Sequence, residues 1–211
     1  MTRAWLTIVA VLIPAIASAQ DTPKVGVTIS APSAIGIIWH IADRIAVRPE
    51  ITLSRSSAET SQNDPVGSAL ATSDDSYAAG VGLGALVYVG RWDGLRTYLI
   101  PRFSYTRSST SAAINNNSVL GPTSSESRAS NYQTSAAFGG QYTFGRHFGL
   151  FGEAGFSYTR TNTSSSTTFT TTVTTIANGV ITQTSRVQTS GSSSRANAVS
   201  TRSAVGVIIY F

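Results

Sequence analysis

Apolar and polar side chains alternate with a period of two along eight separate stretches of the chain. This period is typical of β-strands, because successive side chains of a strand point to opposite faces of the sheet. We therefore predict strands at residues 24–30, 34–41, 45–57, 77–89, 95–107, 131–144, 148–160 and 198–211. Short turns at 42–44, 90–94 and 145–147 alternate with longer polar connections, which predicts an up-and-down antiparallel sheet.

The two faces of each predicted strand differ in character. One face is apolar, and the other is small, polar or charged, as where Leu99 and Phe103 alternate with Arg102. An eight-stranded barrel with such strands is either a secreted lipocalin-like barrel with an apolar interior or a membrane barrel with a polar interior. The position of the charged residues favours the second architecture.

Five charged residues lie in the middle of predicted strands on the smaller face, beside several glycines. Glycines leave room for bulky neighbours inside a narrow barrel, and opposite charges can pair there. We therefore predict an all-β, eight-stranded transmembrane barrel with short periplasmic turns and long extracellular loops. Its predicted lumen charge network consists of Arg48, Glu50, Arg102, Glu153 and Arg202.

The aromatic residues agree with a membrane barrel. Four tyrosines lie on the apolar face near the long-loop ends of their strands, and other aromatics lie near the opposite ends. Two such girdles flank the apolar band of barrels that cross a bilayer. The tyrosines are Tyr77, Tyr105, Tyr132 and Tyr158, and the opposite group is Trp39, Trp92, Phe144, Phe148 and Phe211.

The first residues carry the pattern of a secretory signal peptide. Arg3 precedes an apolar run at residues 4–13, and the small residues Ala17, Ser18 and Ala19 form a cleavage site. A membrane anchor would need about 20 apolar residues. We predict a signal peptide at 1–19 and a barrel domain at 20–211. The chain has no cysteine and a net charge of +5, and for an exported protein lipid phosphate is a better counter-ion than nucleic acid.

The last two strands are predicted to form one long hairpin. Asn178-Gly179 is the strongest hairpin signal in the chain, and the residues around it are rich in Thr, Val and Ile. This turn makes the numbers of paired residues sum to 357, so that Gly155 faces Arg202 and Phe151 faces Gly206. The outer part of the hairpin, residues 163–195, is rich in Ser and Thr.

The last strand resembles the closing strand of bacterial outer-membrane β-barrels. Gly206, Ile209 and Phe211 occupy the places where the assembly signal of that family has a glycine, a hydrophobic residue and a final aromatic, although Ala204 stands where a polar residue is usual. With the strand layout, this resemblance extends over the mature chain and indicates the OmpA/OmpX-like superfamily. It implies insertion into the bacterial outer membrane by the barrel assembly machinery, and a barrel that makes up the whole mature protein.

The resemblance implies three possible functions. The first is a non-enzymatic barrel that acts in envelope integrity or in surface interaction through its loops. The second is a small, mostly closed or gated pore, and the third is an enzyme that modifies lipid A. We expect a monomer without cofactor or metal and without nucleic acid as a partner; the surface ligand stays open.

The residues that could carry catalysis are few. His40 and His147 are the only histidines, and neither has the serine two positions away that lipid A deacylase barrels use. Neither lies at the outer rim, where palmitoyltransferase barrels place theirs. A nucleophile without a nearby base is inert, so we predict that the chain is not an enzyme.

Two groups of charged residues remain to be interpreted. The lumen charges either fill the barrel as ion pairs, among them Glu153 with its diagonal neighbour Arg202, or form an electrostatic gate. Arg55, Arg107 and Arg160 lie at the loop-side strand ends on the outward parity. Because the arginine fork suits phosphate, we predict that these three contact lipopolysaccharide.

Overall fold

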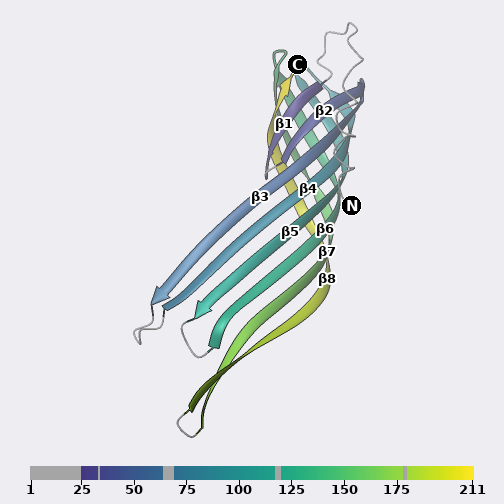
Figure 1. Ribbon diagram of the computed structural model, residues 1–211. Helices are drawn as coiled ribbons and strands as arrows, with labels where there is room; N and C mark the ends of the chain where they lie inside the picture. The colour runs from purple at the N-terminus through teal and green to yellow at the C-terminus, as the bar shows by residue number, and fades with distance from the viewer. Residues whose placement is uncertain (1–24, 33, 64–68, 117–119, 178–179) are drawn as a thin grey trace, which may run out of the picture.

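The computed structural model describes residues 25–211 except 33, 64–68, 117–119 and 178–179, so the predicted signal peptide lies outside the described residues. Eight strands follow one another in the described part (Figure 1). They are β1 (Val25–Ala31), β2 (Ala34–Ala42), β3 (Ile45–Asn63), β4 (Ala69–Arg91), β5 (Leu95–Asn116), β6 (Leu120–Phe144), β7 (Phe148–Ala177) and β8 (Val180–Tyr210). Among the described residues, no helix is long and apolar enough to cross a membrane.

The strands form a closed antiparallel barrel in which each strand pairs with its neighbours in sequence and β1 pairs with β8. The connections at 43–44, 92–94 and 145–147 lie at one end, which we call the turn end. The C-terminus lies there too, where the Phe211 amide donates to the Val25 carbonyl at 3.1 Å. The predicted all-β, eight-stranded up-and-down fold is confirmed.

Six of the strands are much longer than the alternation predicts. β7 and β8 have 30 and 31 residues, and β3 to β6 also continue beyond the barrel as one curved sheet (Figure 1). Much of what we predicted as long loops is therefore paired strand. Thr has a high β-propensity, and cross-strand hydroxyl pairs such as Thr168–Thr189 at 3.0 Å and Ser165–Ser192 at 2.9 Å add to the pairing. We call this part the projecting sheet.

The predicted hairpin register is confirmed. Ala177 pairs with Val180, Gly155 with Arg202 and Phe151 with Gly206, without a register shift over the whole β7–β8 ladder. Beyond the pair Leu120–Thr171, β7 has no described β6 partner, so residues 172–177 and 180–185 project as a two-stranded ribbon. The predicted turn residues Asn178 and Gly179 lie outside the described residues.

The two faces of the barrel wall are those that the alternation predicts. Apolar side chains such as Leu53, Val81 and Phe156 are exposed on the outside, with exposed fractions of 62%, 60% and 67%. Of the predicted lumen charges, Arg48, Glu50, Arg102 and Glu153 are buried, with Arg48 only 1% exposed, and Arg202 is half-buried. A lipocalin-like arrangement with an apolar interior and a polar exterior is thereby excluded.

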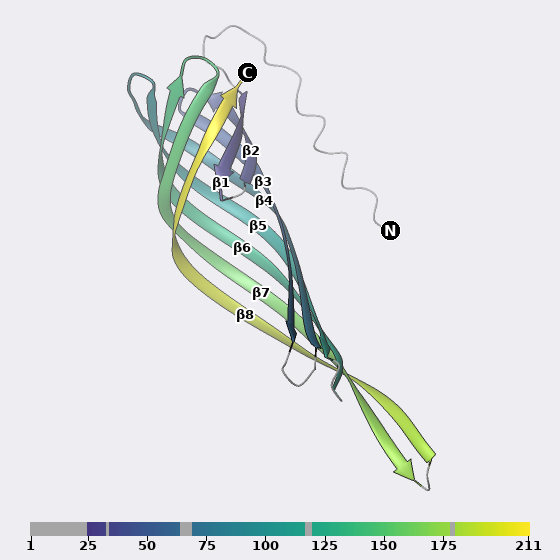
Figure 2. The ribbon, with the colours of Figure 1, turned by 90° about the vertical axis from the view of Figure 1, so that its left-hand side faces the viewer.

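The barrel wall has unequal height. β1 and β2 have only 7 and 9 residues, and their hairpin ends where Ala31 pairs with Val205 and Ala34 pairs with Thr52. Past that level, β3 and β8 continue with no described neighbour on this side. Figure 2 shows the short hairpin between them and the inner faces of the opposite strands beyond it. We call this gap in the wall the side opening.

Candidate functional site

Two arginines and two glutamates meet in the middle of the barrel. Arg48 Nη2 lies 2.5 Å from Glu153 Oε1, and Arg102 Nη2 lies 2.8 Å from Glu50 Oε1 and 3.4 Å from Glu153 Oε2. Arg48 Nε is also 2.7 Å from Glu50 Oε1, although the direction of this contact does not suit a hydrogen bond. The four charges cancel, and strands β3, β5 and β7 hold them together across the lumen. We call this group the charge cluster.

Phe151 covers the charge cluster from one side. Its ring centre lies 4.8 Å from the guanidinium carbon of Arg48, a cation–π distance. The ring fits because Gly206 stands opposite it on β8, where any side chain would collide with it. The inward glycine predicted from the sequence therefore makes room for a lumen aromatic.

A layer of buried tyrosines and Gln141 lies inside the barrel at the turn end. The Tyr98 hydroxyl donates to Glu153 Oε1 at 3.0 Å, which connects this layer to the charge cluster. The Tyr88 hydroxyl donates to Gln141 Oε1 at 3.3 Å, and the Gln141 amide donates to the Tyr210 hydroxyl. Together with apolar neighbours the three tyrosines form one buried cluster, in which Tyr98 is completely buried.

We did not single out this aromatic layer from the sequence. The signal was available, because Tyr98 shares the inward parity of its strand with Arg102, and Tyr88 shares that of its strand with Gly84. The alternation of apolar and polar residues does not reveal this layer, because near the turn end the inward side chains are apolar as well as the outward ones. Tyr98 can be placed inside the barrel only by noting that it lies an even number of positions from Arg102, so that both side chains are on the same face of the strand.

Arg202 stands apart from the charge cluster. The sequence suggested an ion pair with Glu153, its diagonal neighbour, but Glu153 is occupied by Arg48, Arg102 and Tyr98. Among the described residues, Arg202 has no ion pair. The expected pairing is wrong because contacts across a narrow lumen compete with contacts along one ladder.

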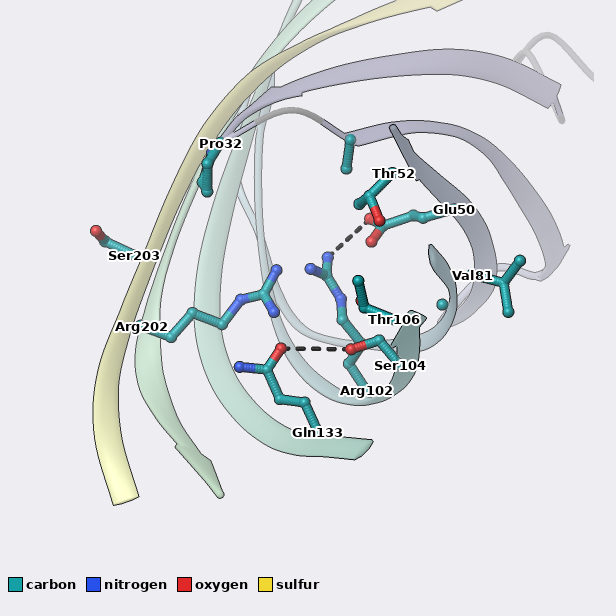
Figure 3. A pocket seen from close by; sticks show the side chains of 12 residues that line it. Pro32, Glu50, Thr52, Val81, Arg102, Ser104, Thr106, Gln133, Arg202 and Ser203 are labelled. Atoms are coloured by element: carbon teal, nitrogen blue, oxygen red, sulfur yellow. Dashed lines mark hydrogen bonds and ion pairs between the residues drawn. The ribbon is translucent and has the colours of Figure 1, made fainter. Parts of the chain in front are cut away.

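A cavity of about 220 Å³ lies beside Arg202, on the projecting side of the charge cluster. Arg202 points into it, and the opposite side is formed by Arg102 with its partner Glu50 (Figure 3). The Ser104 hydroxyl donates to the Gln133 side-chain oxygen at 3.3 Å along its floor. Pro32 and Ala34, at the end of the β1–β2 hairpin, also line this Arg202 cavity.

The three arginines predicted at the outer rim are all exposed. Arg55 pairs across the ladder with Tyr77, and its Nε lies 3.6 Å from Asp75, in an exposed ion pair that contributes little. Arg107 lies two positions from Tyr105, and Arg160 lies two positions from Tyr158. The structure thus places all three at the level of the tyrosine girdle and pointing outward.

Both histidines lie at the turn end, away from the Arg202 cavity. The His40 ring stacks on Tyr88 with its Nε2 2.9 Å from the Tyr88 hydroxyl, and His147 Nδ1 lies 3.3 Å from the Tyr210 carbonyl oxygen. The His40 ring is half-buried beside the lumen tyrosines Tyr88 and Tyr210, whereas His147 is exposed in the turn at 145–147. No serine or carboxylate among the described contacts of these rings forms a catalytic arrangement with them.

No family model matches the chain, and no curated protein matches it significantly. Solved structures similar to it include CarO of Acinetobacter baumannii, with 14% identity and a TM-score of 0.39 over 92% of this chain and 100% of that one. A second, CarO2 of the same organism, has 12% identity and a TM-score of 0.38 over 90% and 99%. A major outer membrane protein of Thermus thermophilus has 12% identity and a TM-score of 0.46 over 89% and 98%. We draw no functional argument from similarities this distant.

Proposed function

We propose that this chain is an integral protein of the bacterial outer membrane that acts at the cell surface through its projecting sheet. The barrel crosses the bilayer with its turn end in the periplasm, and its closed lumen serves as a rigid support. The observation that carries this proposal is a wall apolar around its whole circumference, combined with a charged interior.

The apolar band has the height that a bilayer requires. In β3 it extends over the nine residues from Ile45 to Leu53, which matches the length of about 9–11 residues that a tilted strand needs to cross a bilayer. Soluble proteins rarely expose a continuous apolar patch of more than a few hundred Å². A band that follows all eight strands therefore supports a lipid surround. The Gly206, Ile209 and Phe211 pattern of the last strand fits recognition by the barrel assembly machinery.

The filled lumen supports a structural role more than conduction or catalysis. Eight strands leave an interior just wide enough for side chains, and here the charge cluster and the aromatic layer occupy it. We therefore expect refolded protein in planar bilayers to show no steady conductance. Regular single-channel steps would instead favour the gated pore.

The projecting sheet presents many hydroxyl groups and few charges, a surface suited to hydrogen bonding with hydrated surface polymers. To test its role, residues 172–185 are replaced by Asn-Gly, which removes only the two-stranded ribbon beyond β6. The barrel should still fold and insert, while attachment of expressing cells to polysaccharide-coated surfaces should fall to that of cells without the protein. Unchanged attachment by the shortened protein would contradict a role of the ribbon in surface interaction.

The rim arginines give a separate prediction. We propose that Arg55, Arg107 and Arg160 bind lipopolysaccharide phosphates, with Arg55 contributing least because Asp75 competes for it. Lipopolysaccharide should raise the melting temperature of the wild type in micelles more than that of the variant with all three changed to Gln. The matched control is Arg186→Gln, on the order of 40 Å further along β8 than the girdle. If lipopolysaccharide stabilises the triple variant as much as the wild type, the proposed contact is wrong.

A further inference from the structure

The Arg202 cavity lies where the barrel wall ends early. At the level of the β1–β2 hairpin, three strand spacings of about 4.8 Å separate β8 from β3, or about 14 Å in total. Directly beyond the pairs Ala31–Val205 and Ala34–Thr52, the two strands that fill this distance are missing. Pro32 and Ala34 line the cavity from the hairpin end, so the cavity lies next to the side opening.

The level of the side opening falls within the apolar band. Tyr158 of the girdle pairs with Val199, six positions along β8 from Val205, where the β1 partner is lost. Over this length the β8 edge has no described β1 partner. Backbone groups at an open edge are not tolerated against hydrocarbon unless they line a polar cavity. The edge thus requires a polar occupant beside it, either water or a head group.

The surroundings of the opening are apolar on the outside and positively charged on the inside. Outside, Ile29, Ile35 and Val205 are 49%, 54% and 63% exposed around the hairpin end. Inside, the charge cluster is neutral, and Arg202 adds a positive charge that has no carboxylate partner among the described residues. A ligand with an anionic head and an apolar tail matches both sides.

The size of the cavity fits the head rather than the whole ligand. Pockets that enclose a small molecule have volumes of about 300–1,000 Å³, whereas the Arg202 cavity has about 220 Å³. An apolar tail would therefore stay outside, along the exposed isoleucines. Gln133 and Ser104 supply further polar groups beside the guanidinium (Figure 3).

We propose that the side opening admits an anionic single-chain amphiphile from the outer leaflet, whose carboxylate or phosphate binds Arg202 while its chain stays in the bilayer. This inference rests on the proposed membrane placement of the barrel. A small anion arriving through the lumen would use the same Arg202 chemistry, so the test has to distinguish the two sources.

The test uses the full mature chain refolded in an uncharged detergent, with dansyl-labelled undecanoic acid as the fluorescent probe. We expect saturable binding by the wild type and binding weakened about tenfold or more by Arg202→Gln, because a charge-assisted hydrogen bond is lost. Arg202→Lys should recover most of the affinity. Arg186→Gln, which removes an exposed arginine of the same hairpin far from the cavity, should bind like the wild type.

Competitors separate the two sources of the anion. Decanoate should displace the probe, while decanol, acetate and inorganic phosphate at the same concentration should not. Displacement by acetate or phosphate as effective as that by decanoate would overturn entry from the bilayer. Equal probe binding by wild type and Arg202→Gln, with both showing the heat-dependent gel shift of a closed barrel, would overturn the site itself. Absence of that shift in the wild type would instead count against the membrane barrel.

Discussion

Glu153→Ala is expected to lower the free energy of unfolding of the barrel by about 3–5 kcal/mol, because it removes one side of a buried ion pair. Glu153 accepts contacts from Arg48, Arg102 and Tyr98, and its side chain is 1% exposed. Without it, Arg48 keeps only Glu50 as a counter-charge, in a place that water hardly reaches. Denaturant unfolding of the refolded protein in detergent, followed by tryptophan fluorescence, measures the loss.

Glu126→Ala is the matched control for this variant. Glu126 also pairs with an arginine, Arg128, at 2.6 Å, but both side chains are about half exposed. Exposed pairs contribute about 0–1 kcal/mol, so this variant should unfold close to the wild type. If Glu153→Ala and Glu126→Ala unfold at the same denaturant concentration, the charge cluster has no structural role.

Gly206→Ala is expected to disturb the seam between β8 and β1. A methyl group on Gly206 would lie 2.5 Å from the Phe151 ring and too close to the backbone oxygen of Ile29. The ring could only move toward Arg48, which it covers, and the backbone of β1 cannot give way without loosening the closing strand pair. Over-packing of this kind costs about 1–3 kcal/mol, or more where backbone is involved.

Gly152→Ala is the control for the seam variant. Gly152 lies on the neighbouring strand β7, and a methyl group there would have no described atom within 4 Å. Its unfolding should match the wild type or improve slightly, since Ala loses less chain entropy than Gly on folding. Equal behaviour of the two variants in the heat-dependent gel shift and in denaturant would show that Gly206 is not required for closure.

The alternation of side chains along the strands was sufficient to predict the fold and which side chains point into the barrel. A charge such as Arg48 can be buried inside a barrel only with a partner, so its position identified the inner face of β3, and the alternation extended that assignment along the strand. The Asn178-Gly179 motif was sufficient to predict the β7–β8 register. Both arguments depend only on the period of two along a strand and on the register that a turn imposes, and these hold along the whole β7–β8 ladder.

The strand lengths could not be predicted in the same way. Beyond residue 160, both faces of β7 carry Ser and Thr, so the period of two disappears although the strand continues. The partners of the charges were equally hidden. Glu153 and Arg48 are 105 positions apart and meet across the lumen, because the stagger of the closed barrel brings their levels together. A ladder register alone does not contain that information.

The most direct test of the central claim, a barrel that crosses the outer membrane with its sheet outside, is labelling of single cysteines in intact cells. The chain has no cysteine, so Thr182→Cys in the ribbon and Asp93→Cys in a turn each introduce one reactive site. A maleimide that cannot cross membranes should label Thr182→Cys in intact cells, and Asp93→Cys only after the outer membrane is permeabilised. Labelling of Asp93→Cys in intact cells, or protection of Thr182→Cys, would contradict the proposed arrangement.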